Sequence, residues 1–166
     1  MPTLLTTIID FRIVYTEKMQ GVKMLDTPLQ NLDLIDALSE RHIQLRSITE
    51  KLWNDTSDIY ISNSEWFIMA RIYKKQPTIA YVSKHVDISR QATHKFIKNL
   101  ESKGLVEIST LENNRKDKCI RLTKLGEECY EQNELLKANI EKQITDSIGH
   151  EKVKLLKEIL KSDWNL

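Results

Sequence analysis

The segment Ser89-Arg-Gln-Ala-Thr-His-Lys-Phe-Ile-Lys-Asn-Leu-Glu-Ser-Lys-Gly104 contains the strongest structural signal in this 166-residue chain. Ser89 is a favourable N-cap and Gly104 suits the left-handed residue that ends a helix, so the pattern predicts a helix from Arg90 to about Lys103. The apolar side of this helix consists of Ala92, Phe96, Ile97 and Leu100. Polar and basic side chains cover its other faces, which indicates a helix anchored on one side and free to bind on the other.

Two alternating segments follow the helix, at residues 105–109 and 119–122. They flank the charged sequence Asn114-Arg-Lys-Asp-Lys118. Alternation with a period of two is typical of half-buried strands. We therefore expect a two-stranded wing with a charged tip.

The residues before Ser89 complete a helix-turn-helix pattern. Ser62 and Glu65 have the spacing of a capping box, and the helix that they open must end before Pro77. Thr78 can cap a short helix that reaches about His85. Together with the wing, these segments predict a mainly α fold with a small β-wing, a winged helix-turn-helix.

Long amphipathic segments flank this unit. Apolar residues recur every three or four positions from Leu32 to Leu52, and again after Thr123 at Leu125, Cys129, Leu135, Leu136, Ile140, Ile144 and Ile148. Gly149 is expected to separate a final helix. We assign residues 1–28 to an arm of uncertain structure, 29–61 and 123–166 to dimerisation helices, and 62–122 to the winged helix-turn-helix.

Charge is strongly segregated along the chain. The whole sequence has 25 Lys and Arg against 24 Asp and Glu, yet residues 71–126 have 13 basic and 5 acidic residues, a net charge of +8. The remainder has 12 basic and 19 acidic residues, a net charge of −7. A basic block that coincides with the helix and wing favours a polyanionic partner over an ordinary solvated surface.

Several other classes of protein are disfavoured. No apolar run approaches the roughly 18 residues of a membrane span, and no signal-peptide pattern opens the chain, so we expect a cytoplasmic protein. Cys119 and Cys129 lack a metal-binding or redox spacing, and His42, His85, His94 and His150 are scattered, so we expect no metal site and no cofactor. No nucleophile–base pattern indicates an enzyme.

Double-stranded DNA is the partner that these features predict. Candidate contacts to base edges lie early in the helix, and candidate contacts to phosphate lie at its cap, beside it and on the wing. The former are Arg90, Gln91, Thr93, His94 and Lys95; the latter are Lys75, Ser89, Lys116 and Lys118. Lys98 and Asn114 are further candidates for DNA binding. Arg115 at the hairpin tip suits a narrow minor groove. For each lysine, a solvated surface charge is the alternative.

From about Leu32 onward, the chain resembles the MarR family of bacterial transcription regulators. The resemblance rests on residues 62–73, 82–83, 86–89, 100–106, 114–116 and 122–126. It implies a homodimer with two winged helix-turn-helix lobes, usually a repressor, that binds short inverted repeats. Family members usually have Asp-Arg-Arg at the wing tip, where this chain has Asn114-Arg115-Lys116, so the carboxylate that braces the wing is replaced by an amide.

One further expectation follows from the resemblance. MarR-like proteins often respond to small anionic ligands, and His42, Arg46, Trp53 and Trp66 are candidates to line an effector pocket, with core or interface packing as the alternative. The competing functional class is a winged-helix module that binds another protein and no DNA. The basic character of the predicted recognition helix favours the DNA-binding class.

Overall fold

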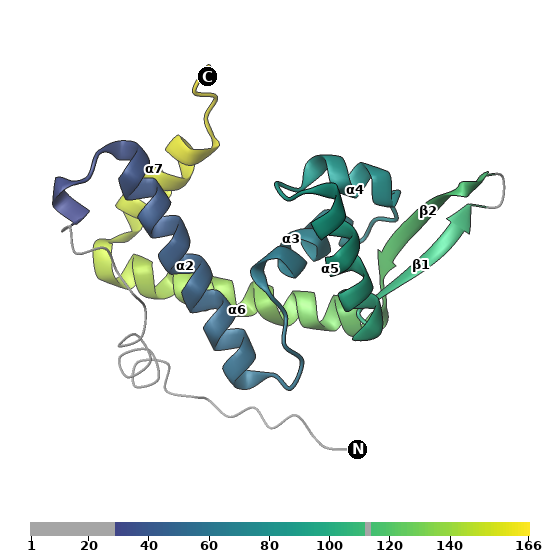
Figure 1. The fold of residues 1–166 in the computed structure, drawn as a ribbon. Coiled ribbons are helices and arrows are strands. Elements are labelled where there is room, and N and C mark those ends of the chain that lie inside the picture. The colour runs from purple at the N-terminus through teal and green to yellow at the C-terminus, as the bar shows by residue number, and fades with distance from the viewer. Residues whose placement is uncertain (1–28, 112–113) are drawn as a thin grey trace. The chain divides into compact units, whose positions relative to one another are not determined.

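The computed structural model describes residues 29–111 and 114–166, so the expected arm at residues 1–28 lies outside the described residues. Figure 1 shows a mainly α-helical chain with one small antiparallel sheet, which confirms the predicted fold class. The elements in chain order are η2 (Leu29–Asn31), α2 (Leu34–Thr56), α3 (Asn63–Ile72), α4 (Ile79–His85), α5 (Arg90–Ser102), β1 (Val106–Leu111), β2 (Asn114–Leu122), α6 (Lys124–Ile148) and α7 (His150–Lys161).

The chain divides into two compact units, residues 1–51 and 52–166, and the boundary falls within α2. In the first unit, the described part consists of η2 and most of α2. The Asp33 carboxylate accepts a hydrogen bond from the Asp36 amide at 2.9 Å, which satisfies one free donor at the start of α2. The helix therefore begins after Leu32, the first residue of its expected apolar stripe.

The second unit is built around one hydrophobic core. Buried side chains from the end of α2, from α3, α4 and α5, from both strands and from α6 contribute to it: Trp53, Ile61, Trp66, Ile68, Met69, Ile72, Ile79, Val82, Val86, Ile97, Leu100, Leu105, Val106, Ile120, Leu122 and Cys129. This core holds the helix-turn-helix and the base of the wing together.

Each helix of the helix-turn-helix begins at the cap that the sequence predicts. Glu65 closes a capping box with Ser62 at the start of α3. The Thr78 hydroxyl accepts from the Tyr81 amide at 3.1 Å, and the Ser89 hydroxyl accepts from the Ala92 amide at 3.2 Å. These local hydrogen bonds fix where α3, α4 and α5 begin.

The wing is an antiparallel hairpin whose base is tied to the loop before α4. Its register pairs Val106 with Leu122 and Ile108 with Ile120, and it shifts between Thr110 and Leu111. The Ile120 amide also donates to the Pro77 carbonyl at 3.0 Å. The wing is therefore attached to the helix-turn-helix by the chain that leads from α5 into β1 and by this pairing of β2 with the loop before α4.

The segment from α5 into the wing packs closely against the start of α6. Gly104, with φ of +72°, ends α5 in the left-handed region. The Thr123 hydroxyl donates to the Gly104 carbonyl at 2.6 Å and accepts from the Gly126 amide at 3.1 Å. A Cβ at Gly126 would lie 2.0 Å from the Leu105 carbonyl oxygen, so only glycine allows this approach.

The C-terminal helices only partly follow the expected stripe. Cys129 and Ile140 are buried, but Leu125, Leu135 and Ile148 are exposed. Gly149, with φ of +95°, separates α6 from α7 as expected. Helix α7 packs against α6 through Val153 and exposes Leu155, Leu156, Ile159 and Leu160. Much of the apolar surface of these helices therefore has no covering residue among those described.

Candidate nucleic-acid interface

Helix α5 is amphipathic, with one side buried in the core and the other exposed. Thr93, Ile97 and Leu100, at spacings of four and three residues, form the buried side. Ser89, Arg90, Gln91, His94, Lys95 and Lys98 are exposed. The structure thus places six of the sequence-predicted contact residues on the accessible part of α5 and its cap.

Thr93 corrects the sequence analysis. Its side chain is fully buried, with 0% exposure, and its hydroxyl donates to the Ser89 carbonyl at 3.0 Å. A side chain in this position cannot touch a thymine methyl group. Its helical spacing to Ile97 and Leu100 indicated burial, but the polarity of threonine suggested an exposed side chain. Burial is possible because the helix backbone accepts the hydrogen bond of the hydroxyl.

The other end of α5 is fixed by a complete Schellman motif. The Gly104 amide donates to the Glu101 carbonyl at 2.9 Å, and the Leu105 amide donates to the Leu100 carbonyl at 3.0 Å. Leu100 and Leu105 are both fully buried. The hydrophobic contact that accompanies this motif therefore belongs to the core, so helix end and core stabilise each other.

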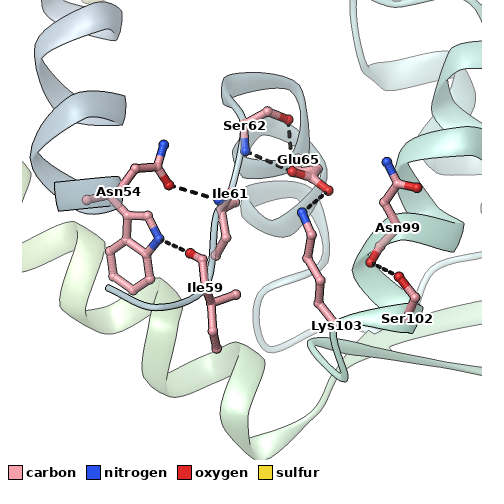
Figure 2. A network of polar contacts seen from close by, with 9 residues as sticks. Asn54, Ile59, Ile61, Ser62, Glu65, Asn99, Ser102 and Lys103 are labelled. Carbon is pink, nitrogen blue, oxygen red and sulfur yellow. Dashed lines mark hydrogen bonds and ion pairs between the residues drawn. The ribbon is translucent and has the colours of Figure 1, made fainter. Parts of the chain in front are cut away.

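A partly buried ion pair connects the end of α5 to α3 (Figure 2). The Lys103 ammonium lies 2.6 Å from one oxygen of the Glu65 carboxylate, whose side chain is only 2% exposed. The other oxygen accepts from the Ser62 amide at 2.8 Å and from its hydroxyl at 2.9 Å. Lys103 also lies 5.6 Å from the centre of the Tyr60 ring. This network holds the end of α5 against the start of α3.

The ion pair also changes which cations of the basic block are available. Lys103 is neutralised by Glu65, and Arg121 on β2 forms a cross-strand ion pair with Glu107, its register partner on β1. Lys75 and Lys118 are exposed. A count of charges along the sequence treats these four cations alike. In the fold, Lys103 and Arg121 are each paired with a carboxylate.

The tip of the wing carries three of the predicted contacts. The backbone of residues 114–117 belongs to β2, but the side chains of Asn114, Arg115 and Lys116 lie outside the described part of the structure. Their roles stay predictions. Figure 1 shows the two described strands of the wing running away from the helices of this unit.

The candidate effector residues divide between the two units. Trp53 and Trp66 are buried in the core and pack edge to face, with ring centres 5.0 Å apart. The Trp53 indole donates to the Ile59 carbonyl at 2.8 Å (Figure 2). These contacts favour the packing alternative for both tryptophans. His42 and Arg46 lie in the first unit, and a pocket formed with them stays a prediction.

Other chemistry has little support in the described residues. Across 29–111 and 114–166, no three His, Cys, Asp or Glu side chains gather as metal ligands. Cys119 and Cys129 are buried and unbridged, and burial, with a smaller effect of Glu128, raises the pKa of the Cys129 thiol. Within the same ranges, no helix combines the length and apolarity required to cross a bilayer.

Comparison with known proteins identifies the fold. No protein-family model and no curated protein matches the sequence. Among solved structures, FabT of Streptococcus pneumoniae in complex with DNA is 22% identical, with a TM-score of 0.66 over 76% of this chain and 90% of FabT. Apo MarR of E. coli is 18% identical, with a TM-score of 0.67 over 78% of this chain and 96% of MarR.

A SlyA-like transcription regulator from Listeria monocytogenes is also similar, at 19% identity and a TM-score of 0.65 over 78% of this chain and 85% of that protein. The three matches cover most of each solved chain as well as three quarters or more of this one. The resemblance inferred from the sequence is thus confirmed for the fold, and this chain has the fold of the MarR-family transcription regulators.

Proposed function

We propose that this protein is a DNA-binding transcription regulator that acts as a repressor and binds short inverted repeats as a homodimer. Helix α5 enters the major groove and the wing reaches the adjacent minor groove. One observation carries the proposal: a helix with a fully buried side presents Arg90, Gln91, His94, Lys95 and Lys98 on its exposed side. A rigidly anchored helix with this surface meets the requirements of a recognition helix.

The chemistry of that surface fits duplex DNA. Arginine and lysine can donate to guanine, and glutamine can bond adenine through both of its amide atoms. We assign Ser89 at the helix cap and Lys75 in the loop after α3, both exposed, to contacts with phosphate. The fold is shared with FabT, whose structure was determined in complex with DNA. That similarity supports DNA as the partner.

Two features support a homodimer. On α7, Leu155, Leu156, Ile159 and Leu160 are between 44% and 56% exposed, and in the first unit Ile35 is 74% exposed. Apolar stripes of this kind on terminal helices gain stability when a second copy covers them. A dimer can also place two α5 helices in successive major grooves, about 34 Å apart along the duplex.

We further propose that a small anionic effector releases the protein from DNA, because MarR-like regulators often respond to such ligands. His42, Arg46, Trp53 and Trp66 remain the candidate residues. Since both tryptophans are packed in the core, an effector near them would have to change that packing. Quenching or a spectral shift of tryptophan fluorescence on adding a phenolic acid, with a matching loss of DNA binding, would support this part.

The experiment that tests the proposal is selection of bound fragments from the source genome by the purified protein. We expect enrichment of fragments that share an inverted repeat, with binding that weakens steeply as salt is added. Absence of enrichment and of heparin retention, with a stable heteromeric complex in pull-down, would favour the protein-interaction module instead.

A further inference from the structure

Helix α4 presents a group of three side chains that the sequence analysis did not assign to DNA. Ile79 and Val82 form its buried side. Tyr81, Lys84 and His85 lie on the exposed side. Tyr81 is 49% exposed, so its ring and its hydroxyl are accessible to a binding partner.

The exposed rings of this group are held in a defined arrangement. The Tyr81 and His85 rings stack with centres 3.9 Å apart and planes inclined by 22°. His85 Nδ1 lies 2.8 Å from the Tyr81 carbonyl oxygen. Because a carbonyl oxygen can only accept, Nδ1 must be the donor, and this bond fixes the imidazole ring against the phenol ring.

In helix-turn-helix proteins the first helix of the motif crosses the DNA backbone while the second lies in the major groove. Helix α4 is that first helix. We propose that Tyr81 and Lys84 contact backbone phosphate and that His85 is a positioning residue that holds the Tyr81 ring. The inference rests on the proposed DNA-binding function and adds a second contact surface to it.

The two contacts differ in their physical signature. Lys84 neutralises a phosphate and displaces a condensed counterion, so it contributes to the salt dependence of binding. The Tyr81 hydroxyl is a neutral donor and contributes to affinity without a counterion effect. Since the stack already restricts the Tyr81 ring, little side-chain freedom remains to be lost on binding.

Phosphate contacts do not depend on sequence, so a mixed-sequence duplex of about 25 base pairs is a sufficient probe. Fluorescence anisotropy over a salt series compares wild type with Lys84→Gln and Tyr81→Phe. Lys154→Gln removes an equivalent charge from α7, on the side away from the exposed stripe of Leu155, Leu156 and Ile159, and serves as the matched control. Circular dichroism confirms that each variant is folded.

We expect Lys84→Gln to reduce the slope of log K against log salt by about 2, because each chain of the dimer loses one phosphate contact, while Lys154→Gln leaves the slope unchanged. Tyr81→Phe should weaken binding about threefold with the slope unchanged. His85→Ala should weaken binding similarly in wild type but have no effect in the Tyr81→Phe background, because it acts through that hydroxyl. His85→Phe keeps a stacking ring and should restore most of the affinity.

The outcomes separate this inference from the function on which it rests. If wild type binds no duplex at low salt, the proposed DNA-binding function fails. If wild type binds but Lys84→Gln matches Lys154→Gln and Tyr81→Phe matches wild type, the contact surface on α4 is disproved while the function stands. An equal loss on His85→Ala in both backgrounds would contradict the positioning role.

Discussion

The Lys103 ammonium and the Glu65 carboxylate lie 2.6 Å apart and join the end of α5 to the start of α3. The two residues are 38 positions apart in the sequence. Glu65 thereby serves two elements at once, since its other oxygen closes the cap of α3 through Ser62. The orientation of the proposed recognition helix depends on this buried carboxylate.

Lys103→Met should therefore lower the free energy of unfolding by about 2 kcal/mol, because it leaves a buried carboxylate without its cation. Urea unfolding measures the change. Lys98→Met, on the exposed face of the same helix, is the matched control and should change stability by less than about 0.5 kcal/mol. Equal effects of the two substitutions would show that the ion pair contributes nothing.

Substitution of Thr93 should change stability but not DNA affinity, whereas substitution of Gln91 should change DNA affinity. Thr93→Val keeps the shape of a fully buried side chain but removes the hydroxyl that donates a hydrogen bond to the Ser89 carbonyl. The free energy of unfolding should fall by about 1 kcal/mol, and DNA affinity should not change. Gln91→Ala removes an exposed donor and acceptor and should weaken binding to a selected operator about tenfold. Anisotropy titration of both variants checks the contrast; a loss of affinity for folded Thr93→Val would contradict the assignment.

Gly126 and Gly104 are required for different reasons. Gly126→Ala places a Cβ against the Leu105 carbonyl and should destabilise the fold by about 3 kcal/mol through overpacking. At Gly104 nothing lies within 4 Å of the added Cβ, so Gly104→Ala should cost only about 1 kcal/mol, from its positive φ. Thermal unfolding should place Gly126→Ala well below Gly104→Ala, and the reverse order would contradict the described approach of α6 to Leu105.

Burial raises the pKa of the Cys129 thiol above its ordinary value of 9.0, and Glu128 adds to the shift. In the unfolded chain this thiol ionises first as pH rises, so its contribution to stability is present below pH 9.0 and is lost above it. Native protein should therefore react slowly with a thiol reagent at pH 8, and both cysteines should react at once in urea. A fast native phase that Cys129→Ser removes would contradict this burial.

Much of the fold follows from local signals in the sequence. Ser62, Thr78 and Ser89 each cap the helix that they were expected to open, and Thr123 caps α6 in the same way, because a cap needs only its next three residues. Gly104 likewise ends α5 by its own conformational freedom. Elements bounded by such residues are predictable without knowledge of the tertiary structure.

Features that depend on distant residues were not predictable. The partner of Lys103 lies on another helix, and the burial of Thr93 depends on packing, so neither is visible in local composition. Leu135 fits a helical apolar stripe yet is 66% exposed in the single chain. Periodicity identifies an apolar face, but it does not say whether the same chain or a second copy covers that face.

Arg115 is the most specific prediction for the wing. Arg115→Ala should weaken operator binding at least tenfold and reduce the salt slope by about 2 for the dimer, since the arginine on each wing contributes both a contact and a charge. Titration against a selected operator at several salt concentrations measures both quantities. Unchanged affinity and an unchanged slope would remove the wing from the interface.

Hydroxyl-radical footprinting of a selected operator, together with the stoichiometry of the complex, tests the central claim most directly. The account predicts two protected segments related by dyad symmetry, with centres about 10 base pairs apart, bound by two chains. Protection of a single segment by one chain, or none on any selected fragment, would contradict the claim that paired α5 helices bind successive major grooves.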